Sequence, residues 1–169
     1  LAVGNYSVTV TNANTCTATA NYQITQPLTL TASAVATTNF SGFNVSCFGS
    51  TNGAASVTAS GGVIPYTYLW GNGSTSATAI NLPAGSAPIT VTDANGIANG
   101  CTEVAGPVNM IEPQPLVVAI SGDNLLCNGD ADGNVTGTIA GGTAPYTITL
   151  NETGASQTVA VDGGSYDFT

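Results

Sequence analysis

The sequence predicts an all-β fold made of tandem β-sandwich repeats of about 85 residues. Three kinds of landmark recur 80 positions apart: Cys47 and Cys127, Gly53 and Gly133, Pro65 and Pro145. Short stretches of alternating apolar and polar residues are separated by turn-forming residues, and no stretch has helical periodicity. A fixed spacing combined with short alternating strands indicates a repeat array rather than one large domain.

Residues 1–27 are expected to be the C-terminal part of a repeat. Residues 4–10 alternate apolar and polar side chains, residues 12–15 have turn chemistry, and residues 16–24 alternate again. This pattern predicts two half-buried strands joined by a turn, with the rest of their repeat outside residues 1–169.

Residues 28–115 are expected to form a complete β-sandwich repeat. Its predicted strands cover residues 28–32, 45–47, 54–59, 66–70, 77–82 and 89–92. Tyr66, Tyr68 and Trp70 share one face at a period of two, so we expect them in the core, with Tyr146 as the counterpart of Tyr66. Seven or so strands with an inward Trp on the third main strand predict an immunoglobulin-like topology.

Residues 116–169 are expected to be the N-terminal part of the next repeat. The repeat spacing is 80 positions in the first part of a unit and longer toward its end, where Cys16 and Cys101 are 85 positions apart. Gln114-Pro115-Leu116 repeats Gln26-Pro27-Leu28 after 88 positions. We expect short Gln-Pro linkers between units, and insertions in surface turns, where a repeat tolerates them.

Charge and composition exclude several functions. The chain has no Lys, Arg or His against nine Asp and Glu, for a formal charge of −9. Without basic residues it lacks the means to neutralise phosphates or to bind an anionic membrane, so neither nucleic acid nor membrane insertion is expected. It also lacks an imidazole base, a Schiff-base lysine and a carboxylate-binding arginine. The nine acids are scattered rather than paired in one pattern, so we expect no enzyme activity.

The motifs of the middle unit resemble a known family. The run Cys-Phe-Gly-x-x-Asn-Gly at 47–53, the Gly-Gly-x-x-Pro-Tyr-x-Tyr-x-Trp at 61–70 and the Val-Thr-Asp-Ala-Asn-Gly at 91–96 are similar to the SprB-type repeat. Such repeats occur in very large surface adhesins of gliding bacteria of the Bacteroidetes group. The resemblance implies secretion by the type IX route, an extracellular location at the cell surface, and a role in adhesion or gliding motility.

The four cysteines favour an oxidising compartment. We expect Cys47 to pair with Cys101 within the complete repeat, and Cys16 and Cys127 to pair with cysteines outside residues 1–169. Such a bridge closes a loop of about 54 residues and contributes on the order of 4 kcal/mol in the chain-entropy model. The alternative pairs Cys16 with Cys47 and Cys101 with Cys127, which would join neighbouring units.

Two other candidate sites have simpler interpretations. Asn128, Asp130 and Asp132 resemble the start of a calcium loop, but Ile139 stands where the twelfth-position Glu belongs. We therefore expect a polar turn and no cofactor, with calcium as the alternative. Tyr22, Phe40 and Phe43 are aromatic residues outside the core pattern and would be the candidates for stacking on a sugar.

The sequence as a whole predicts a structural segment of a surface filament or stalk. Its partners would be neighbouring repeats of the same chain and other copies in a filament. One alternative is an array of carbohydrate-binding modules that contacts a surface polysaccharide. The other is a fibre subunit that associates laterally through uncovered strand edges.

Overall fold

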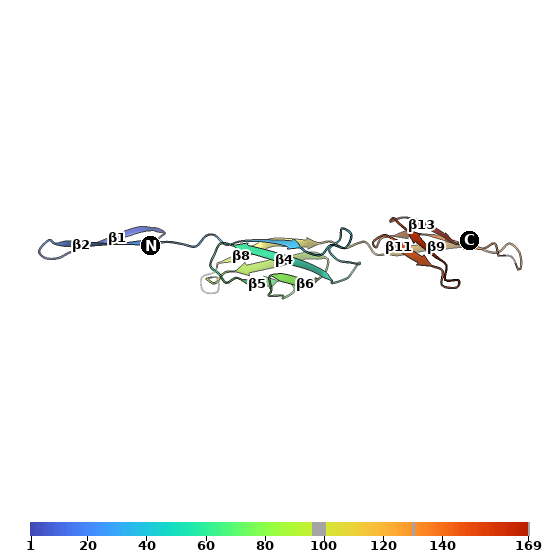
Figure 1. The fold of residues 1–169 in the computed structure, drawn as a ribbon, viewed down its shortest axis with the longest axis horizontal. Coiled ribbons are helices and arrows are strands. Elements are labelled where there is room, and N and C mark those ends of the chain that lie inside the picture. Colours follow the sequence, from blue (N-terminus) through green and yellow to red (C-terminus); the bar gives the residue numbers. More distant parts are fainter. Residues whose placement is uncertain (96–100, 130, 169) are drawn as a thin grey trace.

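The computed structural model describes residues 1–95, 101–129 and 131–168. All regular structure in these residues consists of strands in small antiparallel sheets, which confirms the all-β prediction. Three groups of strands lie in a row along the long axis (Figure 1). We call them the N-terminal hairpin (β1–β2), the central sandwich (β3–β8) and the C-terminal group (β9–β13). The tandem period of about 85 residues stays a prediction.

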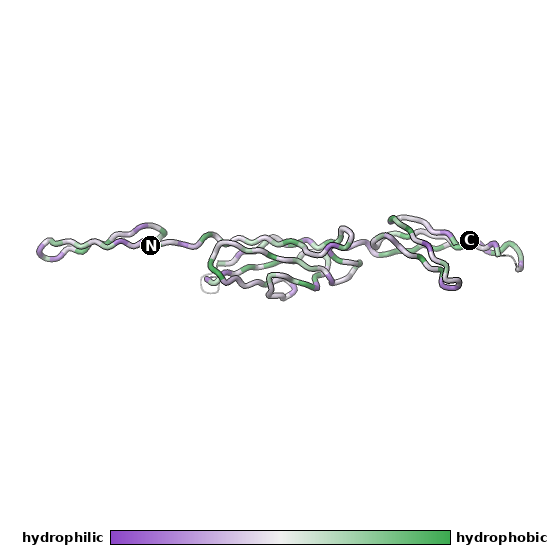
Figure 2. The backbone as a smooth tube through the Cα atoms, in the orientation of Figure 1, coloured by the Kyte–Doolittle hydropathy of each residue, from purple (hydrophilic) through white to green (hydrophobic). Residues whose placement is uncertain are grey.

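The N-terminal hairpin pairs β1 (Gly4–Thr11) with β2 (Thr17–Ile24). Strand residues alternate between two faces, so the register divides the hairpin into an apolar and a polar face. The apolar face carries three cross-strand pairs: Tyr6 and Tyr22, Val8 and Ala20, Val10 and Ala18. The other face carries only Asn, Gln, Ser and Thr. The alternation is visible along the strands in Figure 2.

The central sandwich has two three-stranded sheets. One has the order β3-β4-β6 and the other β5-β7-β8. Their bounds are β3 (Thr31–Ala36), β4 (Gly53–Ser60), β5 (Thr67–Trp70), β6 (Thr78–Leu82), β7 (Gly85–Thr92) and β8 (Thr102–Met110). This order is that of strands A, B, E and C, F, G in an immunoglobulin-type sandwich. The described residues between 28 and 115 form six strands, whereas the sequence predicted seven or so.

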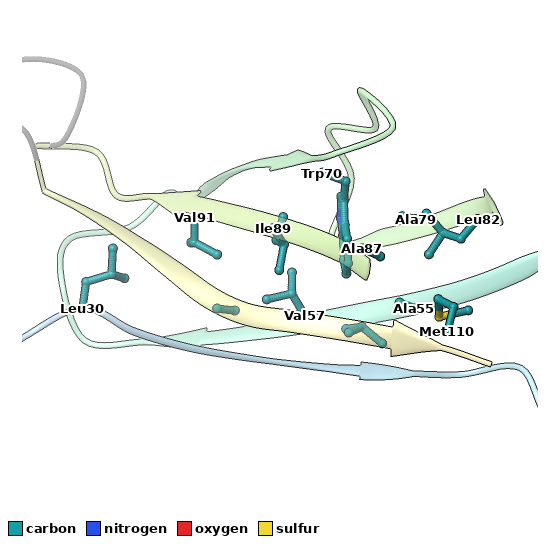
Figure 3. Packing of buried hydrophobic residues seen from close by; sticks show 12 residues of the cluster. Leu30, Ala55, Val57, Trp70, Ala79, Leu82, Ala87, Ile89, Val91 and Met110 are labelled. Atoms are coloured by element: carbon teal, nitrogen blue, oxygen red, sulfur yellow. The ribbon is translucent and has the colours of Figure 1, made fainter. Parts of the chain in front are cut away.

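The core of the central sandwich lies between these two sheets (Figure 3). Every second residue of β4 and β7 points inward, including Ala55, Val57, Ile89 and Val91. Trp70 is buried against them, and its indole N–H donates to the Ser76 carbonyl at 2.9 Å. A single large ring with many small Ala and Val side chains fills the space between the sheets.

The C-terminal group also has two sheets. One has the order β13-β10-β9 and the other pairs β11 with β12. The bounds are β9 (Val117–Asp123), β10 (Asn134–Ala140), β11 (Tyr146–Thr149), β12 (Ser156–Val159) and β13 (Ser165–Phe168). Its small core consists of Ile139, Tyr146, Val159 and Tyr166. All of β9 is exposed, so this group is less covered than the central sandwich.

Two strands of the C-terminal group pair differently from their counterparts. In the central sandwich β6 lies beside β4 and β7 beside β5. In the C-terminal group β13 lies beside β10, and β12 beside β11. A physical reason is Gly137, which stands 80 positions after Val57 and leaves room for the ring of Tyr166 across the strands. Tyr166 also donates its hydroxyl hydrogen to the Ala119 carbonyl at 3.1 Å.

The strand register corrects the position of the linkers. Thr31 pairs with Ser60 as Val117 pairs with Ala140, which makes β9 the counterpart of β3 after 86 positions rather than 88. Glu112-Pro113 therefore takes the place of Gln26-Pro27, and the predicted equivalence of Gln114-Pro115 is two residues out of register. Because a shift of two keeps each side chain on the same face, the burial pattern survives this error.

Candidate functional site

The Gly-Gly-x-x-Pro-Tyr loop holds the chain that enters the central sandwich. The Gly62 N–H donates to the Leu28 carbonyl at 2.7 Å, and the Tyr66 hydroxyl donates to the Gly61 carbonyl at 2.6 Å. Gly61 has φ +75°, and a Cβ there would overlap the Thr29 carbonyl. Only glycine lets the loop approach the entering strand this closely. We call this arrangement the first clamp, formed by Gly61, Gly62 and Tyr66.

The second clamp repeats this geometry in the C-terminal group. The Gly142 N–H donates to the Gln114 carbonyl at 2.7 Å, and the Tyr146 hydroxyl donates to the Gly141 carbonyl at 2.6 Å. A Cβ at Gly141 would overlap the Pro115 carbonyl. The glycines and tyrosines of the two clamps are 80 positions apart, and in both units they hold the segment that enters the unit. The second clamp consists of Gly141, Gly142 and Tyr146.

Tyr146 gives the second clamp a predicted pH dependence. Burial, and to a smaller extent the Asp162 carboxylate, raise the pKa of Tyr146 above its usual 10.0. Folding thus favours the neutral phenol. Its contribution to the free energy of unfolding is complete below pH 10 and is lost as the pH rises through the folded-state pKa. We expect the stability difference between wild type and Tyr146→Phe to shrink above that pH, measured by thermal unfolding across a pH series. An unchanged difference would contradict this assignment.

A buried carboxylate ties the turn between β7 and β8 to the first clamp. Asp93 is only 2% exposed. Its Oδ2 accepts from the Val63 N–H at 2.9 Å, and its Oδ1 accepts from the Asn95 N–H at 3.0 Å. The Ala94 N–H also donates to the Val63 carbonyl at 2.8 Å. In the second clamp, Asp162 accepts from the Gly141 N–H at 2.8 Å.

The segment that leaves the central sandwich is also held by hydrogen bonds and by burial. The Ile111 carbonyl accepts from the Asn44 and Val45 N–H groups at 2.8 and 3.2 Å, and the Ile111 N–H donates to the Asn44 side chain at 3.0 Å. Glu112 accepts from the Gly49 N–H at 2.7 Å. Pro113 is fully buried. Residues 111–116 are therefore anchored by the 44–49 loop on one side and by the second clamp on the other.

The predicted Cys47–Cys101 disulfide is absent, and all four cysteines are free and exposed. The physical reason is the direction of β8. Cys101 directly precedes this nine-residue strand, whereas the Cys47 loop is bonded to Ile111 and Glu112, which follow it. Nine strand residues span about 30 Å, and bridged Cα atoms lie within about 7 Å of each other. The two thiols therefore lie at opposite ends of the sandwich.

The alternative pairs do not form within the chain either. Cys16 lies at the turn of the N-terminal hairpin, which points away from the central sandwich (Figure 1). Cys127 lies in the loop between β9 and β10, on the far side of the C-terminal group from the central sandwich. The central sandwich thus has one cysteine just before its last strand and another in the loop after its first strand, at opposite ends.

The predicted core aromatics lie on the inner faces. Trp70 and Tyr146 are buried, and Tyr66 and Tyr68 are half-buried and pack against the core of the central sandwich. Tyr22 is exposed on the N-terminal hairpin, while Phe40 and Phe43 form a backbone bridge and are half-buried. Among the described residues the one ring contact is between Tyr166 and Phe168, whose planes are inclined at 55°. This tilt does not make a flat platform for a sugar.

Asp130 of the calcium candidate lies outside the described residues. Asp132 accepts from the Leu126 N–H at 3.3 Å, so its carboxylate closes its own loop. Within the described ranges no three His, Cys, Asp or Glu side chains gather in a way that could hold a metal. No helix in these ranges is long and apolar enough to cross a membrane.

Sequence reasoning missed the two clamps. Their signal was present, because Gly-Gly-x-x-Pro-Tyr recurs at a constant spacing of 80 while the neighbouring turns vary in length. A constant spacing between glycines that precede a strand indicates a close backbone approach, here to the linker. The partner of that approach became apparent only from the strand register.

The family comparison matches the parts of the chain that contain the clamps. The SprB repeat model matches residues 43–75 and residues 120–155. No curated protein matches the chain, and no solved structure matches it. The SprB repeat is a structural rather than enzymatic repeat, typical of cell-surface proteins, which indicates an extracellular repeat segment. The chain thus carries two matches to the SprB repeat family, as the motifs around the clamps predicted.

Proposed function

We propose that this chain is a stiff segment of a secreted surface filament that serves bacterial adhesion or gliding motility. The observation that supports this role is the anchoring of residues 111–116 on both sides. A linker without such bonds would let neighbouring units swing independently. With both ends bonded, the central sandwich and the C-terminal group would transmit a pull along one line.

The exterior fits the same role. The chain has no basic residue, so it offers no cleavage site to proteases that require Lys or Arg. Its exposed strand faces are rich in Thr, Ser and Asn. A hydrated, mildly acidic surface disfavours nonspecific association.

Stiffness at residues 111–116 is directly measurable. Residual dipolar couplings of the wild-type chain should fit one alignment tensor for the central sandwich and the C-terminal group together. The double variant Asn44→Ala with Glu112→Ala removes the side-chain bonds of the junction, so the two groups should then require separate tensors. Glu152→Ala, at an exposed turn in the C-terminal group, is the matched control and should keep one tensor. Separate tensors in the wild type would overturn the stiff-segment proposal.

The cellular role has its own test. Antibodies against the central sandwich should label intact, unpermeabilised cells of the source organism. Deleting the coding sequence should reduce attachment or surface movement. Labelling confined to permeabilised cells would overturn the surface role.

A further inference from the structure

The first and last strands of the central sandwich lie side by side and run in the same direction. β3 and β8 start at the same end, where Leu30 and Thr102 line one shallow groove. They also end together, because Asn44 bonds to Thr38, two residues after β3, and to Ile111, directly after β8. Between these ends the two strands are in contact. β3 and β8 are therefore parallel neighbours.

A pull on the two ends of the chain acts on these strands in opposite directions. Residues 26–30 enter β3 from the side of the N-terminal hairpin, and residues 111–116 leave β8 toward the C-terminal group (Figure 1). The strands of the central sandwich run along the long axis of the row in Figure 1. Tension along this axis therefore makes β3 and β8 slide past each other and does not peel either strand away.

β3 resists this sliding through its hydrogen bonds to β4. All six residues of β3 pair with β4. The Leu28–Gly62 bond of the first clamp extends this ladder at one end, and the Thr37 N–H donates to the Ala54 carbonyl at 2.8 Å at the other end. The bonds of an antiparallel ladder are perpendicular to the strands, so a pull along β3 strains them together instead of one after another.

Asn44 joins the end of β3 to the end of β8. Its side-chain N–H donates to the Thr38 carbonyl at 3.1 Å, and its backbone carbonyl accepts from the Thr38 hydroxyl at 2.7 Å. Its side-chain oxygen accepts from the Ile111 N–H at 3.0 Å, and its backbone N–H donates to the Ile111 carbonyl at 2.8 Å. Every polar group of Asn44 is thus bonded to the residue that follows one strand or the other. The next residue, Val45, is fully buried and holds this loop in place.

We propose that Asn44, through its bonds to Thr38 and Ile111, is a mechanical lock that keeps the central sandwich folded under tension. When the chain is pulled, Thr38 moves with β3 toward one end and Ile111 moves with β8 toward the other. The bonds that Asn44 makes to both must break before the two strands can slide. This Asn44 lock deepens the proposed function and rests on it for its use, because a surface filament is where such tension arises.

Asn72 makes bonds of the same kind away from the pulled strands. Its side-chain N–H donates to the Ile80 carbonyl at 3.1 Å, and its side-chain oxygen accepts from the Ser74 N–H at 3.1 Å. It lies in the turn between β5 and β6, and neither of these strands continues into a linker. Asn44→Ala and Asn72→Ala therefore each remove one side-chain donor and one side-chain acceptor, but only Asn44 connects β3 to β8.

The first test holds the complete 169-residue chain at constant force in optical tweezers, by handles ligated to its two termini. A reducing buffer keeps the four cysteines as thiols. The central sandwich is recognised by its unfolding step, since residues 28–111 measure about 300 Å when extended. We expect Asn44→Ala to speed this step at least about tenfold, because two bonds that carry the load are lost. Asn72→Ala should speed it less than about twofold, because its turn is still intact when the strands slide.

Unfolding in urea without force separates the Asn44 lock from ordinary stability. Both variants should lower the free energy of unfolding, followed by the fluorescence of Trp70, the single Trp of the chain. Relative to its loss of stability in urea, Asn44→Ala should speed unfolding under force far more than Asn72→Ala does. The lock is wrong if the two variants speed unfolding under force in the same proportion to their losses in urea.

Thr38→Val tests the lock from the side of β3. It removes the hydroxyl that donates to the Asn44 carbonyl and accepts from the Ala54 N–H at 3.0 Å, and it leaves the bonds of Ile111 and Glu112 in place. We expect about tenfold faster unfolding under force, while the central sandwich and the C-terminal group still fit one alignment tensor. An unfolding rate under force equal to that of the wild type would overturn the lock and leave the stiffness of residues 111–116 untouched.

Discussion

Replacing Gly61 by alanine is expected to destabilise the central sandwich by about 3–5 kcal/mol, because it combines a left-handed backbone with a backbone collision. Gly61 has φ +75°, a conformation that L-residues adopt at a cost. Its new Cβ would overlap the Thr29 carbonyl, which is main chain and cannot rotate away. Either the loop or the entering strand must move, and the Gly62–Leu28 bond would be lost with it.

The measurement is equilibrium unfolding in urea, followed by the fluorescence of Trp70. Gly73→Ala is the matched control, because Gly73 has φ +85° but no atom within 4 Å of its would-be Cβ. The control should lose only the stability that the left-handed backbone conformation costs, about 1–2 kcal/mol. If both variants lost the same stability, the collision at the linker would be wrong and the first clamp would not be a tight contact.

The fold was predictable where side-chain period alone decides the outcome. The alternation of β1, β2, β4 and β7 gave the strands, and the period of two placed Trp70 inside. A wrong linker alignment did no harm to these predictions, because a shift of two residues keeps every side chain on its own face. The all-β class follows from such local patterns.

The disulfide could not be predicted in the same way, because it depends on strand direction. Cys47 and Cys101 flank the same unit in sequence, and chain entropy favours bridging them. Only the topology reveals that β8 separates them by its whole length. A cysteine just before the last strand and one in the loop after the first strand of a sandwich lie at opposite ends.

The pairing of β12 and β13 also depends on more than local pattern. Their sequences alternate as strands should, but the alternation does not say which sheet they join. In the central sandwich β6 lies beside β4. In the C-terminal group Tyr166 lies over Gly137, and β13 takes the place beside β10. Tertiary context outweighs sequence propensity here.

Replacing Asp93 by alanine is expected to cost the central sandwich about 2 kcal/mol, because a buried acceptor is removed from two half-buried backbone donors. The Val63 and Asn95 N–H groups donate to its two oxygens at 2.9 and 3.0 Å. The Val63 bond joins the turn between β7 and β8 to the first clamp. The loss should therefore loosen the clamp as well as lower the unfolding free energy, seen as faster amide exchange at Gly62.

Asp93→Asn separates the hydrogen bonds from the charge. Asparagine keeps one acceptor oxygen, and in the N-terminal hairpin Asn12 occupies this very position and accepts from the Asn14 and Cys16 N–H groups at 2.9 Å. We expect Asp93→Asn to lose about 1 kcal/mol, clearly less than alanine, since one of the two bonds survives. Equal losses for the two variants would mean that charge rather than bonding holds the turn. A smaller loss for Asp93→Asn would show that Asn12 and Asp93 have the same structural role. Each side chain accepts backbone hydrogen bonds that fix the turn at the end of its hairpin, and so fixes the backbone that leads to the cysteine that follows.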